Sequence, residues 1–600
     1  MSLFFIMKMT EKSRMCTHSG LFLCSWESFF LTGFKLSISE NVHKILQFVR
    51  RYYGCYTKTG SEKGENIMKK KVLVCLLCLV TVVGSLAGCG SKPEDKASTS
   101  ESVKSDKPEE KDIMESIKDI KVKEASQEEL EAFLKDEDEN TLLVDARPQE
   151  AYSGWALEGA QKGGHLKGAA LYSARWLDCF YSSYAPREGY LTTSMEDQDI
   201  TKDKKVIVYD YSGKQAETVA RYLKSQGVEE VAYCKADKLI DEGTYVESYT
   251  NHDRFVPTEI VKNISDVKTG KSDSLSEEAV EITGGNVDNV VLVDVGWGNA
   301  KESTYLSVGH VPGSIHINTD SYERPRVYVP EKRSDYAKEW RLIPLEEFRD
   351  SVCTQYGITK DSVVILSGVT IDAQGRLGFM LRSLGVKVYV MSGGLTAWMY
   401  NDYDLDKENI EIPVSVDSFG SDIIAFPDEI VWMDEVKNIL AGNQEGQIID
   451  NRSEDEDNGE KTGYNYHDLA GRIEGTLFCP QATKERGEFT QNVDATPKTR
   501  QEIEKYLVKH DVDLDKPMIF FCGDSWGAAK IAYWAQSVDI NNIKEWGNGW
   551  IPWSNMGNDF IDHNGDKVHY DKYLDTVVDD KGNNKRDGVN ILDDKKEETK

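Results

Sequence analysis

Short apolar runs recur along the chain and alternate with segments of helical periodicity. Three of the runs end in aspartate, LLVDAR at Asp145, VLVDVG at Asp294 and QIIDNR at Asp450. About 70 residues later in each case comes a second run, KKVIVYD, DSVVILS and KPMIFFC, then a loop and the helical patterns QAETVARYLKSQG, RLGFMLRSLG and AAKIAYWAQSV. This alternation predicts βαβ units, with a mostly parallel sheet that helices cover on both faces.

The pattern is an internal repeat. The three aspartates lie roughly 150 residues apart, and each is followed by a similar motif, GHLKGA, GHVPGS or GRIEGT. Concordant spacing of separate motifs predicts three tandem α/β domains, each with a small mostly parallel sheet flanked by helices. The predicted bounds are 120–252 for domain one, 257–405 for domain two and 425–560 for domain three, with a polar tail over 564–600.

The N-terminal region carries a targeting pattern. The segment MKKKVLVCLLCLVTVVGSLAGCG has lysines, then an apolar run, then small residues before Cys89, which is typical of a secretory signal peptide. Its apolar run is too short for a comfortable membrane span. The signal is therefore predicted over 68–88, with 1–67 an upstream extension outside the fold and 89–119 a Ser/Lys/Glu-rich flexible tether.

Charge and cysteine usage limit the partners and cofactors. A formal net charge of −30 argues against nucleic acid as a partner. The chain has 11 cysteines, and those that follow the predicted signal show no C-x-x-C or Cys/His metal spacing. We therefore expect no metal and no cofactor.

Cys522 is the residue most suited to covalent chemistry. In FFCGDSWGAAK it ends an apolar strand and precedes a short loop and a helix. Successive backbone N–H groups that run into a helix N-terminus stabilise an anionic sulfur, so the pKa of Cys522 is expected below the ordinary value of about 8.5. The predicted binding loop is Gly523, Asp524, Ser525, Trp526, Gly527 and Ala528.

Individual loop residues suggest roles. Gly523 and Gly527 permit a tight path and a close approach of backbone to sulfur. The Ser525 hydroxyl is a candidate donor to the sulfur, Trp526 a candidate apolar wall, and Asp524 opposes the thiolate.

Taken together, these motifs resemble the rhodanese (sulfurtransferase) family. The resemblance rests on the aspartate at a strand end, the G-H-x-x-G segment, the strand–loop–helix unit and the closing GGLTAW and GNGWIPW motifs. It implies that Cys522 takes sulfane sulfur from a small donor such as thiosulfate or a persulfide. The cysteine would hold this sulfur as a persulfide and pass it to a thiol or cyanide. Asp210 and Ser367 stand at the matching positions of domains one and two, which implies that these domains are inactive.

The third copy departs from the family loop. The loop it resembles reads C-G-T-G-W-R-A, and here Gly527 replaces the arginine that would bind an anionic donor. Thiosulfate is therefore not expected to be the preferred donor. Asp450, Arg452 and Arg472 of the same domain are candidates for a supporting role. A Cys-dependent phosphatase is disfavoured because C-x5-R would require arginine where Ala528 stands.

The sequence also predicts a lipid anchor and leaves two alternatives, one for Cys479 and one for the function. LAGC, ending at Cys89, resembles a bacterial lipobox, which implies a lipid on Cys89 and a protein exported and anchored to the outer face of the cell membrane. Cys479 is either a packed strand residue or a partner that resolves the Cys522 persulfide as a disulfide. The alternative to an enzyme is a non-catalytic scaffold lipoprotein whose rhodanese-like folds bind a protein partner.

Overall fold

The computed structural model describes residues 113–136, 138–179, 185–323, 342–464, 467–571, 573–574 and 576–585. The predicted extension, signal peptide, Cys89 and most of the tether lie outside these residues. Within them, no helix is both long and apolar enough to cross a membrane.

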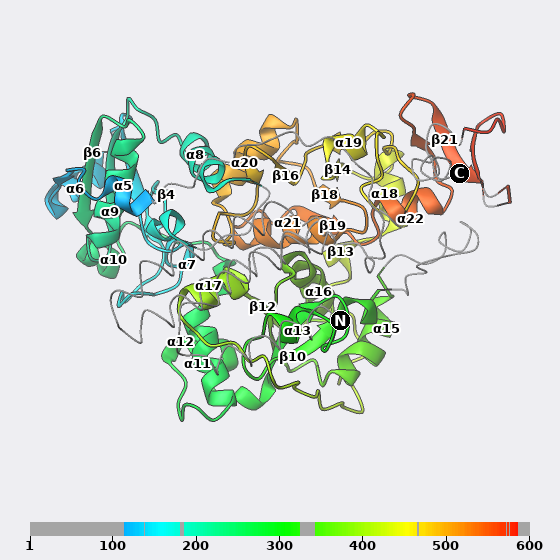
Figure 1. Ribbon diagram of the computed structural model, residues 1–600, viewed down its shortest axis with the longest axis horizontal. Helices are drawn as coiled ribbons and strands as arrows, with labels where there is room; N and C mark the ends of the chain where they lie inside the picture. Colours follow the sequence, from blue (N-terminus) through cyan, green and yellow to red (C-terminus); the bar gives the residue numbers. More distant parts are fainter. Residues whose placement is uncertain are drawn as a thin grey trace, which may run out of the picture. The chain divides into compact units, whose positions relative to one another are not determined.

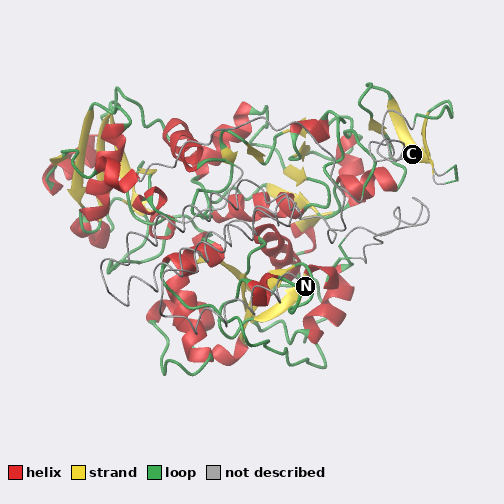
Figure 2. Cartoon of the chain, in the orientation of Figure 1, coloured by secondary structure: helices red, strands yellow, loops and turns green. Residues whose placement is uncertain are grey.

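Three five-stranded parallel sheets follow one another along the chain, as the sequence predicts. Their strand orders are β1-β6-β5-β2-β4, β8-β12-β11-β9-β10 and β13-β19-β18-β14-β15. Each is the same order of first, fifth, fourth, second and third strand. Helices lie on both sides of the sheets (Figure 2).

Domain one is built around β1, β2, β4, β5 and β6. Its strands are β1 (Lys123–Glu124), β2 (Thr141–Asp145), β4 (Ala170–Leu171), β5 (Lys205–Asp210) and β6 (Glu230–Lys235), with a small β3 (His165–Leu166) and β7 (Val246–Glu247) pair. Its helices are α5 (Ile113–Ile117), α6 (Gln127–Asp136), α7 (Gln149–Ser153), α8 (Arg187–Asp197), α9 (Lys214–Ser225) and α10 (Asp237–Glu242). Because Ile117 is buried in the core, the fold begins before the predicted start at 120.

Domain two repeats this plan. Its strands are β8 (Phe255–Val256), β9 (Val290–Gly296), β10 (Ile315–Asn318), β11 (Val363–Ser367) and β12 (Lys387–Met391). Its helices are α11 (Thr258–Lys268), α12 (Glu277–Thr283), α13 (Thr304–Ser307), α15 (Leu345–Glu347), which continues as a π-helical turn over Phe348–Cys353, α16 (Ile371–Ser383) and α17 (Gly394–Tyr400).

Domain three carries the Cys522 loop. Its strands are β13 (Ile430–Val431), β14 (Gln447–Asp450), β15 (Leu477–Phe478), β18 (Met518–Phe521) and β19 (Ile543–Trp546), with the hairpin β16 (Ala482–Thr483) and β17 (Gly487–Glu488). Its helices are α18 (Met433–Leu440), α19 (Glu454–Asp457), α20 (Arg500–Lys509), α21 (Trp526–Ser537) and α22 (Trp550–Asn555).

The predicted polar tail is wrong for its first part. An antiparallel sheet of β20 (Phe560–Ile561), β21 (Lys567–Asp571) and β22 (Thr576–Asp579) occupies this region. Val568, Tyr570 and Val577 are buried in one cluster with the tryptophans of domain three. Alternating apolar residues within a charged stretch give a strand with one buried face, and the overall polarity of the segment hides this pattern.

Domains two and three share one continuous hydrophobic cluster. Helix α16 lies directly against α21 (Figure 1). A Cβ added at Gly375 of α16 would lie 2.9 Å from the backbone nitrogen of Lys530. A Cβ added at Gly378 would lie 2.9 Å from the Tyr533 ring. The two glycines therefore allow the close approach of these helices. The helix that follows the Cys522 loop thus packs on the corresponding helix of domain two.

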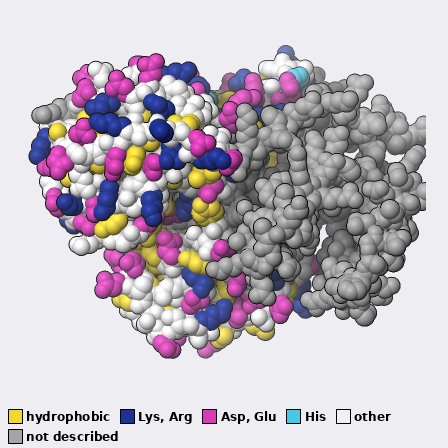
Figure 3. Space-filling model, turned by 60° about the vertical axis from the view of Figure 1, so that its left-hand side comes forward, with side chains coloured by type: hydrophobic (Ala, Val, Ile, Leu, Met, Phe, Trp, Pro, Cys, Tyr) yellow, Lys and Arg dark blue, Asp and Glu magenta, His cyan; other side chains and the backbone are white. Residues whose placement is uncertain are grey.

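Polar contacts join domain one to domain three. Arg175 pairs with Asp494 at 2.8 Å, and Arg486 pairs with Asp197. On the face shown in Figure 3, basic and acidic side chains are interspersed over the described surface.

Candidate active site

The loop after β18 holds Cys522 in a ring of backbone hydrogen bonds. Cys522 as a residue is partly exposed, whereas its thiol is buried within the loop. The N–H groups of Gly527 and Ala528, in the first turn of α21, bind its sulfur and act to lower its pKa. On the other side, the Trp550 N–H donates to the Cys522 carbonyl at 2.9 Å, and the Ile551 N–H donates to that of Gly523 at the same distance. The loop is thus fixed from two helix N-termini.

Domain one has the same loop with a different anion. The Asp210 carboxylate accepts backbone N–H groups from Gly213, from Gln215 at 2.5 Å and from Ala216 at 3.1 Å. Gln215 and Ala216 stand at the same offsets from Asp210 as Gly527 and Ala528 from Cys522. Both loops are therefore anion-binding nests, and domain one fills its own with a carboxylate.

The prediction for Ser367 differs from the structure by one residue. Asp145 faces Tyr209, Asp294 faces Ser367 and Asp450 faces Phe521 in their sheets. By this register, Gly368 occupies the position of Cys522. The Ser367 hydroxyl donates instead to the Val293 carbonyl within the sheet. Strand β11 ends at Ser367, which faces Asp294, just as β18 ends at Phe521, which faces Asp450, and spacing alone does not reveal this register.

The expected low pKa of Cys522 is wrong for this arrangement. Burial raises the pKa of the thiol to about 12, and Asp524 and Asp372 add to the rise. The two loop N–H groups act against this increase without cancelling it. The thiol is therefore protonated at neutral pH in the resting loop. Asp372 belongs to domain two, and its influence is not visible in the sequence around Cys522.

Two side chains that sequence reasoning missed cover the loop. The Tyr464 hydroxyl lies against Gly523, in the space that a Cβ there would fill. Gln481 lies in the same way against Gly527, and its amide oxygen accepts from Asn451 at 3.3 Å. Both loop glycines are required by these neighbours. Only the glycines themselves could have signalled such close packing.

The filled space beside Gly527 changes what an arginine there would do. Gly527→Arg alone is expected to displace Gln481 and lower the free energy of unfolding by about 1–3 kcal/mol, the usual cost of overpacking. The double variant Gly527→Arg/Gln481→Ala makes room, and its KM for thiosulfate should fall because a cation binds the dianion in ground and transition states alike. Thermal unfolding and steady-state kinetics measure the two effects. A single variant as stable as the parent would contradict this packing.

Asp450 and Arg452 form a buried ion pair that supports the strand end. The Arg452 guanidinium bonds Asp450 at 2.6 Å, donates to the Gly471 carbonyl at 2.9 Å and stacks over Trp550 at 4.5 Å. Asp145 and Arg147 make the same pair in domain one. Arg472 is exposed, and its backbone pairs with Ile561, so it does not join Arg452.

Domain two replaces the arginine of this motif with histidine. Gly296 stands where the other domains have Arg147 and Arg452. The His316 Nδ1 lies 2.9 Å from an Asp294 oxygen, and its Nε2 lies 2.9 Å from the Gly298 carbonyl. Each of the three aspartates therefore binds an arginine or histidine side chain at the end of its strand.

Trp526 does not form the expected apolar wall beside Cys522, and Ser525 does not donate to the sulfur. The Trp526 indole N–H donates to Glu323 of domain two at 2.6 Å, so this side chain lies in the interdomain core. Ser525 has φ +69°, in the left-handed region, and caps α21. Its hydroxyl is buried and forms no hydrogen bond with any described residue.

The other cysteines of the described residues are buried and free. They are Cys179, Cys234, Cys353 and Cys479. Burial raises the pKa of Cys479 far above its ordinary value. In this structure Cys479 is therefore a packed strand-end residue, and its N–H donates to the Asp450 carbonyl.

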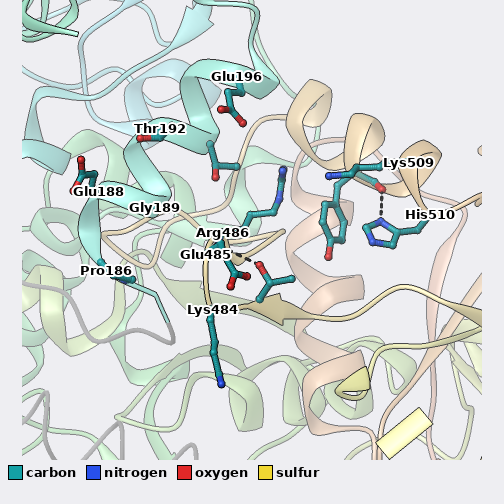
Figure 4. Close-up of a pocket in the computed structure, with 13 residues that line it drawn as sticks. Pro186, Glu188, Gly189, Thr192, Glu196, Lys484, Glu485, Arg486, Lys509 and His510 are labelled. Atoms are coloured by element: carbon teal, nitrogen blue, oxygen red, sulfur yellow. Dashed lines mark hydrogen bonds between the residues drawn. The ribbon is translucent and has the colours of Figure 1, made fainter. Parts of the chain in front are cut away.

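Two cavities lie between domains one and three, and Cys522 lines neither. The larger, of about 680 Å³, is shown in Figure 4, where α8 faces Lys484, Arg486 and His510. The second, of about 530 Å³, lies beside Tyr152, His165 and Arg500. Among the described residues, one cluster has side-chain oxygen and nitrogen atoms close enough together to hold a metal ion. It consists of Asp559, His569 and Asp580, and both aspartates are exposed.

Comparison with known proteins identifies the fold. The family model of the rhodanese-like domain matches residues 126–236 and 279–401. The protein contains rhodanese-like domains. The matched stretches fall within domains one and two, and domain three shares their strand order.

Relatives of these rhodanese-like domains are sulfurtransferases. Thiosulfate sulfurtransferase YnjE of Escherichia coli K12 is 22% identical over 418 residues, covering 69% of this chain and 87% of that protein. The 3-mercaptopyruvate sulfurtransferase of the same organism is 26% identical over 254 residues, covering 42% of this chain and 81% of that protein. The chain is accordingly a sulfurtransferase of the rhodanese type.

Solved structures are similar to most of the chain. A persulfide-bearing variant of EanB with ergothioneine has a TM-score of 0.59 and 25% identity, covering 72% of this chain and 97% of that one. The anaerobic ergothioneine biosynthesis enzyme from Chlorobium limicola, with trimethyl histidine, has a TM-score of 0.59 at 24% identity, which shows a shared fold.

Proposed function

We propose that domain three transfers sulfane sulfur through a persulfide on Cys522. The observation that carries the proposal is the nest of Gly527 and Ala528 N–H groups around the Cys522 sulfur. The matching nest in domain one donates N–H groups to the Asp210 carboxyl, which supports the capacity of the Cys522 loop to hold an anion. A cysteine persulfide in a structure 25% identical to this chain supports the same chemistry.

In the proposed cycle the Cys522 thiol first gives up its proton to solvent, and the resulting thiolate attacks the outer sulfur of the donor. The bond between that sulfur and the rest of the donor breaks, the leaving group takes the electron pair, and Cys522 retains the sulfur as a persulfide. A thiol or cyanide acceptor then attacks the outer sulfur and releases the Cys522 thiolate. The loop N–H groups stabilise the sulfur anion at both steps.

We further propose that a thiol persulfide is preferred over thiosulfate as donor. Lys530, one turn into α21, is already paired with Glu488 and lies 3.6 Å from Asp372. Asp524 adds a negative charge beside Cys522. The carboxylates at this loop therefore repel a dianionic donor, and Lys530 cannot offset the repulsion because it is already paired. A donor of lower charge is repelled less.

Donor competition tests this proposal. With cyanide as acceptor, the mature chain (from Cys89 onward) should use cysteamine persulfide, whose ammonium balances its persulfide anion, with about tenfold higher kcat/KM than thiosulfate, the effect of one missing charged contact. Added salt should narrow the difference, because screening weakens the repulsion. Equal or greater efficiency with thiosulfate would contradict the preference while leaving sulfur transfer intact.

The scaffold alternative has one observation in its favour. Burial and Asp524 raise the pKa of Cys522 to about 12, which keeps the thiol protonated and weakly nucleophilic at neutral pH. A chain that forms no persulfide with any donor, yet binds a protein through its rhodanese-like domains, would support this alternative.

We also propose export and lipid anchoring through Cys89. The support is the sequence pattern that ends in LAGC, followed by the polar segment that precedes the first helix. Cys89→Ser should release the protein from the membrane fraction, because it removes the site of lipid attachment. Fractionation and lipid labelling in a bacterial host measure this. Unchanged labelling of the variant would contradict the anchor.

A further inference from the structure

Arg376 of domain two lies buried beside the catalytic loop of domain three. It belongs to α16 and is 1% exposed. Its guanidinium lies 2.9 Å from Glu323 and 3.9 Å from Glu545, and it donates to the Gly547 carbonyl at 3.2 Å. A buried cation is retained in a protein only where several partners compensate its desolvation.

The partners of Arg376 frame the Cys522 loop on two sides. Glu323 accepts the indole N–H of Trp526, the first residue of α21. Glu545 pairs with Phe520 in the sheet, and Gly547 leads into the turn whose Trp550 N–H holds the Cys522 carbonyl. One guanidinium therefore links both ends of the loop to domain two.

Arg376 also offsets the negative charge of Asp524, the carboxylate of the Cys522 loop. The groups that face it are Glu323, Glu545, Asp524 and Tyr322. Burial raises the pKa of Glu545 to about 8, and Arg376 acts against that rise. Asp524 in turn raises the pKa of Cys522. Loss of the guanidinium would leave three carboxyl groups without this cation near the loop.

We propose that domain two, which has no nucleophile of its own, serves the active domain by supplying Arg376 as a positioning residue for the Cys522 loop. The proposal rests on Cys522 being the nucleophile. It gives the inactive second domain a role in the chemistry in addition to its packing role. Arg376 acts through Glu323, Trp526 and the Gly547 turn, without touching the substrate.

A matched control lies on the same helix. Arg382 of α16 also faces domain three, where it pairs with Glu429 at 3.5 Å. Among the described residues, Arg382 forms no ion pair and no hydrogen bond with the Cys522 loop. Arg376→Met and Arg382→Met both remove an interdomain ion pair, and only the first removes charge from the loop.

The test follows the pH dependence of Cys522 alkylation in the intact mature chain, with the modified peptide identified by mass spectrometry. In the parent, the rate should still rise above pH 9, as the raised pKa requires. In Arg376→Met the profile should move upward by about one pH unit, a tenfold lower rate at a given pH. Arg376→Lys should recover most of the shift, and Arg382→Met should show none.

Equal profiles for Arg376→Met and Arg382→Met would overturn the proposal and leave Arg376 a packing residue only. Arg376→Gln is made alongside, so that if one variant fails to fold, as judged by circular dichroism, the other carries the test. A shifted profile with no persulfide on Cys522 in the parent would contradict the sulfur-transfer function and leave the positioning role standing.

Discussion

Cys522→Ala is expected to abolish sulfur transfer from every donor. In the proposed cycle this side chain supplies the atom that carries the sulfur, and the other cysteines among the described residues are buried and poorly placed to replace it. We expect the rate to fall by roughly 10³-fold or more, as it does when other covalent enzymes lose their nucleophile. Release of thiocyanate from cyanide, measured with the mature chain, gives the readout.

Variants in the other two domains are the controls for this loss. Asp210→Ala empties the nest of domain one, and Ser367→Ala removes one hydrogen bond within the sheet of domain two. Both should leave the transfer rate within about twofold, since neither group can carry a persulfide. Residual transfer in Cys522→Ala, or a comparable loss in Asp210→Ala, would assign the chemistry to another site.

Arg452→Met is expected to produce the largest loss of stability. The variant leaves Asp450 buried without its bidentate partner, at the end of the strand beside β18, which leads into the Cys522 loop. Breaking a buried pair in this way costs about 3–5 kcal/mol. It also removes the bond to Gly471 and the stacking on Trp550.

Hydrogen exchange measures this loss within domain three. Amides of β14 and β18 should exchange far faster in Arg452→Met, whereas those of domain one should be unchanged. Arg472→Ala is the matched control, because this arginine of the same domain is exposed. Protection of β14 equal to that of the parent would show that the pair contributes little.

The sequence was sufficient for the architecture because the fold depends on local patterns. The apolar runs ending at Asp145, Asp294 and Asp450, and the helices after the second runs, predict parallel sheets, and all three sheets have one strand order. The position of Asp210 was predicted in the same way. Ser367 was misplaced because spacing does not determine register to a single residue, and here the register selects Gly368.

The surroundings of Cys522 could not be predicted because they come from distant parts of the chain. Glu323, the partner of Trp526, lies 203 residues away in sequence. Asp372 and Arg376 reach the loop only through the packing of α16 on α21. The loop N–H groups were predicted from local geometry, but the net pKa of Cys522 depends on burial and on charges from domain two.

The most direct test of sulfur transfer by domain three is the mass of the peptide that contains Cys522. The mature chain is treated with glutathione persulfide, the remaining thiols are blocked, and the protein is digested without reductant. We expect one added sulfur atom on Cys522, lost when cyanide is added. An unmodified Cys522 after treatment with persulfide, thiosulfate and 3-mercaptopyruvate in turn would contradict sulfur transfer by domain three.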